Sequence, residues 1–211
     1  MPRPYRHALV LDELAVLPWR SVVAGAALGA ALLSLDASGH MFGGPGSVTM
    51  WLGLGALAGG AAYTLDDASV AVTSAVPVRP ASRLAVRLLV PLALFGLWAM
   101  NAVVAARNRN TGLSVAALGV TGAGVMLLAL GMASLARTSG VAEPGTLVAP
   151  LVLLLVVVVA LALPFMFPEV RLLMATEVSR RDFTVWVVLA SAALAAVGRA
   201  GSDPWRRRRH A

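Results

Sequence analysis

Long apolar runs separated by short polar segments dominate the chain. An α-helix needs about 20 apolar residues to cross roughly 30 Å of hydrocarbon, and several runs approach or exceed that length. They predict membrane-spanning helices over residues 21–35, 48–65, 88–106, 113–136, 147–167 and 183–197. The pattern therefore predicts an all-α, polytopic membrane protein with six transmembrane helices.

The first 20 residues predict an amphipathic helix in the plane of the membrane interface. Their apolar run, residues 8–17, contains Asp12 and Glu13, and the apolar core of a cleaved signal peptide would not tolerate two acids. Pro18 would hinge this helix to the first span, and Trp19 would anchor it at the headgroups. The chain then divides into an interfacial segment (1–20), a transmembrane domain (21–200) and a basic cytoplasmic tail (201–211).

The longest interruption between two apolar runs covers residues 66–87. Asp66 and Asp67 open it, and carboxylates favour the positive N-terminal end of a helix. Pro77 would close that short helix, and Pro80 stands where a new helix would begin. The segment predicts a short helix outside the bilayer, followed by a proline-bracketed corner.

Two arginines follow this corner. Arg83 and Arg87 are four residues apart, so they share one face of the helix that leads into the third span. We expect them to anchor that helix end at the lipid headgroups.

The distribution of arginines sets the orientation, because cytoplasmic loops carry an excess of basic residues. With both termini cytoplasmic, the inner side holds twelve: Arg3, Arg6, Arg20, Arg79, Arg83, Arg87, Arg137, Arg199, Arg206, Arg207, Arg208 and Arg209. The outer side then holds five: Arg107, Arg109, Arg171, Arg180 and Arg181. Residues 66–87 are cytoplasmic in this orientation.

Composition supports membrane insertion and excludes several functions. Hydrophobic residues make up 59% of the chain and charged residues 13%, against about 25% charged residues in a typical soluble domain. The chain has no cysteine, which excludes thiolate metal sites and cysteine nucleophiles. Every basic residue is arginine, which indicates GC-rich coding. The net charge of +7 comes from arginines beside apolar spans, and we expect no nucleic-acid partner.

Residues with catalytic potential are sparse. The interiors of the six predicted spans contain no Asp, Glu, Arg or His. Asp66 and Asp67 have no second acidic cluster with which to hold Mg²⁺ and phosphate, so a helix cap at a membrane exit is the favoured interpretation. A Gly-Lys-Ser/Thr phosphate loop is impossible without lysine. The sequence predicts no enzyme, no cofactor and no metal site of its own.

Small residues recur on single helix faces. Gly25 and Gly29 in the first span, and Gly55 and Gly59 in the second, are each four residues apart and allow two helices to approach closely. We expect these faces to pack within the bundle, with a dimer interface as the alternative.

The corner over residues 75–89 reads Ala-Val-Pro-Val-Arg-Pro-Ala-Ser-Arg-Leu-Ala-Val-Arg-Leu-Leu. With six spans, cytoplasmic termini and an interfacial N-terminal helix, it resembles the type-2 class of ABC transporter permeases, in a variant similar to actinobacterial permeases. Leu65-Asp-Asp-Ala stands where that family usually has Arg-Gly-Thr or Lys-Gly-Thr, and Arg87 occupies the position of its usual lysine.

This resemblance implies the permease subunit of an ATP-driven exporter in a bacterial plasma membrane. Residues 68–76 would form a coupling helix seated in a separate ATPase subunit that binds the ATP. A second permease copy or a paralogue would complete a dimer surrounded by membrane lipids. The implied partner-coupling residues are Asp66, Asp67, Ala68, Val70, Val72, Pro77, Arg79, Pro80, Arg83 and Arg87. The implied outer-gate residues are Pro164, Pro168, Glu169 and Arg171. The two prolines among them would bend or break the fifth span.

Two other classes of protein stay open. A non-transport membrane scaffold or immunity protein would have no ATPase partner, and a small membrane enzyme or ion channel would act alone. A proton-coupled carrier is disfavoured, because it needs ionisable residues inside its spans.

Overall fold

The computed structural model describes residues 11, 13–37, 48–66, 80–108, 114–141, 143–162 and 180–200. Within these ranges the chain is helical and contains no β-strand, which confirms the all-α prediction. The elements are α2 (Trp19–Ala37), α3 (Val48–Ala62) with its 3-10 continuation η1 (Tyr63–Leu65), α5 (Pro80–Arg87), α6 (Leu89–Asn108), α7 (Val115–Thr138), α8 (Pro144–Val157) with its π-helical continuation η2 (Val158–Ala162), and α10 (Arg180–Ala200).

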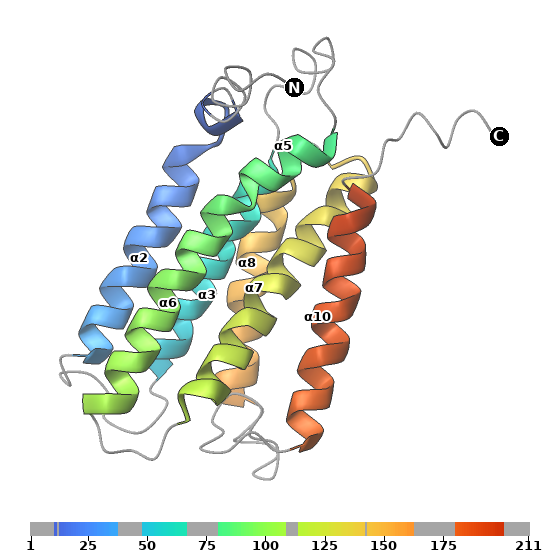
Figure 1. Cartoon of the computed structure of the whole chain (residues 1–211). Helices are drawn as coiled ribbons and strands as arrows, with labels where there is room; N and C mark the ends of the chain where they lie inside the picture. Colours follow the sequence, from blue (N-terminus) through green and yellow to red (C-terminus); the bar gives the residue numbers. More distant parts are fainter. Residues whose placement is uncertain are drawn as a thin grey trace.

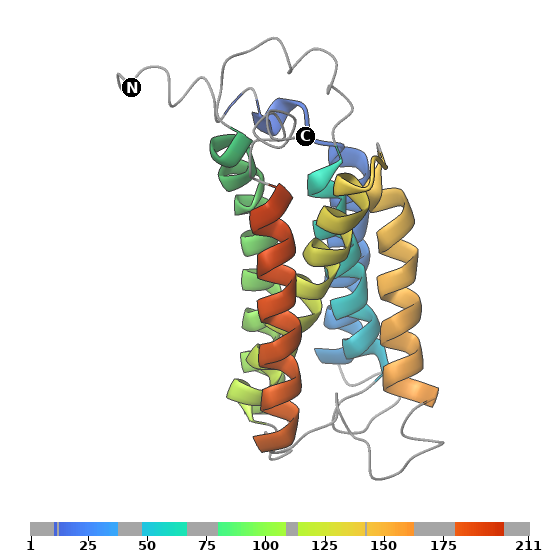
Figure 2. The same cartoon turned by 90° about the vertical axis from the view of Figure 1, so that its right-hand side faces the viewer.

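The long helices stand side by side and alternate in direction along the chain (Figure 1). The start of α2, the end of α3, the α5 helix, the end of α7 and the end of α10 consequently lie at one end of the bundle (Figure 1). We call this the α5 end. Seen from the side, α10 stands apart from α8, and it packs mainly on α7 (Figure 2).

The α3 helix is the centre of the bundle. It contacts α2, α6, α7 and α8, and its residues from Thr49 to Ala62 are all buried except Leu52. Trp51 on α3 meets Trp98 on α6 with 5.9 Å between ring centroids. The indole N–H of Trp98 donates to the Leu118 carbonyl of α7 at 3.2 Å. This aromatic pair joins three helices on the side of α3 that faces α6 and α7.

Glycines let α2 and α3 approach closely. A Cβ at Gly25 would lie 2.8 Å from the Cα of Gly60, and a Cβ at Gly29 would lie 2.7 Å from the Leu57 side chain. On another face of α3, a Cβ at Gly59 would come within 3.3 Å of Ala149 on α8. The predicted packing of these glycine faces within the bundle is confirmed for both helices.

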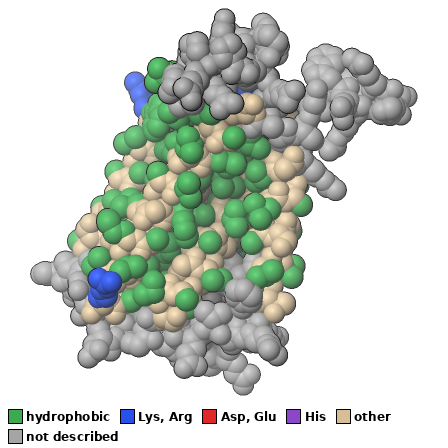
Figure 3. Space-filling model, in the orientation of Figure 1, with side chains coloured by type: hydrophobic (Ala, Val, Ile, Leu, Met, Phe, Trp, Pro, Cys, Tyr) green, Lys and Arg blue, Asp and Glu red, His purple; other side chains and the backbone are tan. Residues whose placement is uncertain are grey.

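Three described helices are long and apolar enough to cross a membrane: Val48–Leu65, Ser82–Val104 and Val115–Thr138. Two shorter apolar helices cover Pro144–Ala160 and Val187–Gly198. Large apolar side chains also lie exposed on the outside of the bundle, including Val23, Leu28, Leu92, Met100, Leu154 and Val188. Hydrophobic side chains cover the middle of the face in Figure 3, and basic side chains appear toward its ends. A hydrocarbon environment accounts for this surface, because water does not favour such a large apolar area.

Pro18 separates the N-terminal segment from the first long helix, as predicted. Residues 13–15 are helical, a turn and a bend follow, and α2 begins at Trp19. The indole N–H of Trp19 donates to the carbonyl of Leu14 at 2.6 Å and fixes the corner. The α2 helix runs to Ala37, beyond the predicted span of 21–35, because helices continue through terminal turns that apolarity alone does not mark.

The fifth predicted span, 147–167, begins earlier than expected, at Pro144. The helix changes from α-helical to π-helical geometry over Val158–Ala162. Pro164 follows two residues later in the sequence, and in an α-helix its ring would clash with the carbonyl four residues before it. The wider winding therefore lies where the α-helical pattern has to change. Residues 163–167 lie outside the described part of the chain.

Glycine packing gives a direct test of the fold. Gly25→Ala should lower the thermal unfolding midpoint in detergent, because its methyl group would press on the backbone of α3 and overpacking costs about 1–3 kcal/mol. Gly96→Ala on α6 is the matched control, since a Cβ there meets nothing within 4 Å and alanine favours a helix over glycine. Equal midpoints for the two variants would contradict the α2–α3 contact.

Candidate functional site at the exit of α3

The structure describes four of the predicted partner-coupling residues: Asp66, Pro80, Arg83 and Arg87. Pro80 begins α5, as its position in the sequence predicted. Six others lie outside the described residues: Asp67, Ala68, Val70, Val72, Pro77 and Arg79. The predicted outer-gate residues Pro164, Pro168, Glu169 and Arg171 also lie outside them. The structure describes the two ends of the segment, which we call its stems. One is the exit of α3, meaning its C-terminal end with η1 and Asp66, and the other is the α5 helix.

Arg87 is the buried centre of the α5 stem. It is 2% exposed, and its Nε donates to Oε2 of Glu13 at 3.0 Å. Arg83, one turn earlier, forms an ion pair with Oε1 of the same carboxylate at 3.3 Å. One buried acid from the N-terminal segment therefore lies between two arginines of α5.

This geometry corrects the predicted role of Arg87. We expected its side chain at the lipid headgroups, but it lies inside the α5 end of the bundle. A buried guanidinium is tolerated because an opposite charge and hydrogen-bond acceptors surround it. Sequence reasoning missed Glu13 as that partner, although an acid within the apolar run of residues 8–17 was the available signal.

Two arginines bind the carbonyls at the exit of α3. Nη1 of Arg87 donates to the carbonyl of Asp66, and Nη1 of Arg137 donates to the carbonyl of Leu65, each at 3.2 Å. Helix C-termini leave carbonyls without partners within the helix and carry a partial negative charge, so cations are favoured there. The last turn of α7 and the α5 stem thus hold the exit of α3 from two sides.

The carboxylate of Asp66 acts as a helix cap for α8. The Gly145 N–H, in the first turn of α8, donates to Oδ1 of Asp66 at 2.5 Å. Glu143 is the N-cap residue of α8, and its own side chain makes no capping hydrogen bond. Capping side chains usually come from the N-cap residue itself, so here α3 supplies the acceptor that α8 lacks locally. The cap was predicted for the short helix that follows Asp66 in the sequence, and residues 67–79 lie outside the described part of the chain. In the structure Asp66 instead caps a helix 79 residues further along the chain.

Burial raises the pKa of Asp66 from 3.8 to about 6. The hydrogen bond from Gly145 and the charge of Arg137 lower this pKa, while the negative charge of Glu143 raises it further. Desolvation dominates because the residue is 5% exposed. Asp66 therefore titrates at a higher pH than an ordinary aspartate.

The described residues of this cluster join segments of the chain to one another. The carboxylate of Glu13 pairs with two arginines, and the carboxylate of Asp66 accepts a backbone N–H. Among the described residues, no three His, Cys, Asp or Glu side chains lie close enough to hold a metal ion. We treat these residues as a joint of four segments: the N-terminal segment, α3 with η1, α5, and the α7–α8 turn.

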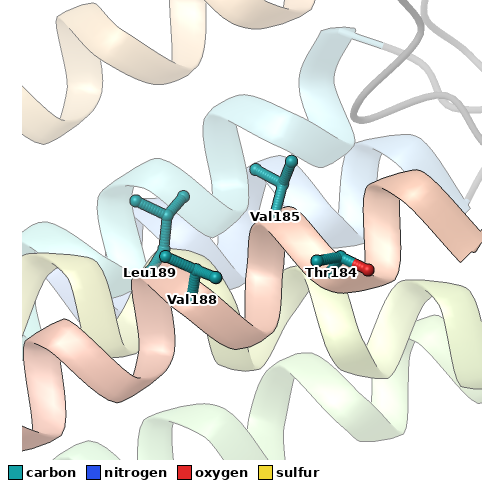
Figure 4. A pocket seen from close by; sticks show the side chains of 4 residues that line it. All are labelled: Thr184, Val185, Val188 and Leu189. Carbon is teal, nitrogen blue, oxygen red and sulfur yellow. The ribbon is translucent and has the colours of Figure 1, made fainter.

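A second feature is an apolar hollow of about 410 Å³ on α10. Thr184, Val185, Val188 and Leu189 line it from two successive turns (Figure 4). Its described lining offers apolar contact and one hydroxyl, and none of these four residues can serve as an acid or base.

Comparison with known proteins found no matching family model, no matching curated protein and no matching solved structure. The resemblance of residues 75–89 to the permease family stays a prediction from the sequence.

The ion pair at Arg87 gives the second prediction. Glu13→Gln should lower the free energy of unfolding by about 3–5 kcal/mol, because it leaves a buried guanidinium without its opposite charge. Tryptophan fluorescence in a denaturant series would measure the loss. The double variant Glu13→Gln with Arg87→Met should recover part of it, because the unpaired charge is gone.

The matched control is Arg107→Gln, since Arg107 is an exposed arginine in the last turn of α6, at the opposite end of the bundle. A loss at Glu13 no larger than the loss at Arg107 would show that the ion pair does not hold the α5 stem.

Proposed function

We propose that this chain is the membrane-spanning permease subunit of an ATP-driven exporter, coupled to a separate ATPase subunit through residues 66–87. The observation that carries the proposal is the joint at the exit of α3. Both stems of the segment meet there, and the same contacts reach the central helix, α7 and α8. A displacement of the segment by a partner would therefore act on the centre of the bundle.

We further propose that α2, α3, α6, α7, α8 and α10 all cross the bilayer, with both termini cytoplasmic. The alternating helix directions support this topology (Figure 1). Arg83, Arg87 and Arg137 lie at the α5 end, whereas Arg107 lies in the last turn of α6, at the opposite end. An inner α5 end agrees with the excess of arginines expected on the cytoplasmic side.

The proposed coupling depends on a stiff connection. Pro77 and Pro80 each fix one backbone dihedral, which limits how far the corner between them can bend. Beyond the corner, Arg83 and Arg87 tie α5 to the N-terminal segment and to α3. A push on residues 68–76 would then reach α3 and α6 together. A membrane scaffold or immunity protein remains the alternative, and it would copurify with a partner other than an ATPase.

Cysteine labelling tests the topology, because the natural chain has no cysteine. A single Ser74→Cys should react with a membrane-impermeant maleimide in inside-out vesicles and stay unlabelled in intact cells. Asn110→Cys, in the predicted outer loop, should show the reverse. Labelling of Ser74→Cys from outside the cell would refute a cytoplasmic coupling segment, and with it the proposed function.

Coupling itself is tested with Val72→Asp and Pro77→Gly, measured by copurification with the proposed ATPase subunit and by stimulation of its ATP hydrolysis. Val72→Asp should weaken binding, because it places a charge in the proposed contact. Pro77→Gly should preserve binding and reduce the response, because it softens the corner. Both variants should insert as well as the natural chain. Normal ATPase stimulation in both would argue for the scaffold alternative.

A further inference from the structure

The contact between Asp66 and α8 is closely packed. Asp66 is 5% exposed, and its carboxylate receives the Gly145 N–H at 2.5 Å. A Cβ at Gly145 would lie 2.7 Å from the Cα of Tyr63 and 2.8 Å from Oδ2 of Asp66. The exit of α3 and the start of α8 therefore touch through backbone atoms. Such a contact has little room to loosen gradually, and parting it would let water reach the carboxylate.

The charged groups around Asp66 come from every segment packed on it. From α7, Arg137 binds the neighbouring carbonyl of Leu65, and from the start of α8, Glu143 adds a negative charge. From α5, Arg83 and Arg87 both pair with Glu13 of the N-terminal segment. The hydrogen bond to the Asp66 carboxylate comes from the backbone N–H of Gly145.

We propose that the Asp66–Gly145 contact is a proton-controlled latch between α3 and α8. A proton on Asp66 favours the closed contact, and ionisation favours parting of α8 from the exit of α3. A neutral carboxyl group still accepts the Gly145 N–H through its carbonyl oxygen and is not penalised by burial. An ionised carboxylate gains hydration when the contact opens.

The direction follows from proton linkage. The closed contact holds Asp66 with a pKa raised from 3.8 to about 6, and a hydrated, open contact would return that pKa to its ordinary value. The closed form therefore binds the proton more tightly. Its advantage over the open form is greatest below pH 3.8, declines as the pH rises to about 6, and then levels off.

Amide hydrogen exchange at Gly145 tests the latch in the full chain, reconstituted in lipid nanodiscs. Protection is measured between pH 5 and pH 7.5 and corrected for the intrinsic rate at each pH. Corrected protection in the natural chain should fall about tenfold between pH 5 and pH 7, as the two pKa values require. Peptides from the middle of α7 serve as the internal control and should show no such fall.

Two variants make the test specific. Asp66→Asn should abolish the pH dependence, because its amide cannot ionise. Glu143→Gln should move the fall to lower pH, because it removes a negative charge that raises the pKa of Asp66. Glu143 is exposed and makes no capping bond, so this variant should fold normally even if Asp66→Asn does not.

Constant protection in the natural chain, the same fall in Asp66→Asn, or a fall unmoved in Glu143→Gln would each overturn the latch. None of these outcomes depends on the proposed transport function, since the measurement needs no ATPase partner.

Discussion

The α5 end of the bundle depends on the buried ion pair between Glu13 and Arg87. A guanidinium that is 2% exposed needs a compensating charge, and Glu13 supplies it from 74 residues earlier in the chain. The same guanidinium also donates to the carbonyl of Asp66. The N-terminal segment, α5 and the exit of α3 thus share one side chain. Loss of either charge would remove one of the links that hold these three segments, and with them both stems of the segment that we propose contacts a partner.

Because α3 lies at the centre of the bundle, the contacts at its C-terminal end connect to most of the other helices. Glycines on two faces of α3 bring its backbone close to α2 and α8, so a shift of α3 would press directly on both neighbours. Two side-chain contacts link the C-terminal end of α3 to neighbouring helices. Arg137 binds one of its carbonyls, while the Asp66 carboxylate holds the start of α8. The helix dipoles favour both contacts, because a cation lies at a C-terminus and an anion at an N-terminus.

The sequence predicted the features that depend on neighbouring residues. Apolar run length located the helices, proline stereochemistry placed the corner at Pro18 and the start at Pro80, and glycine spacing identified the close-packed faces. The pairings between distant segments were not predictable in this way. Glu13 with Arg87, and Asp66 with Gly145, are more than 70 residues apart, and no local pattern records which charges meet. For that reason Arg87 was expected at the headgroups, whereas it lies inside the bundle.

Both ends of α3 are held through an aspartate. At the end opposite the joint, Thr49 in the first turn of α3 donates to Asp36 of α2 at 3.2 Å, with both residues buried. At the exit, Asp66 binds the start of α8. The α3 helix is therefore linked to α2 at one end and to α8 at the other, while its middle makes apolar contacts. Apolar contacts have no directional preference, so they permit small shifts that buried polar contacts resist. Any rearrangement that moves the end of α3 away from α2 or α8 must accordingly break one of these two polar contacts.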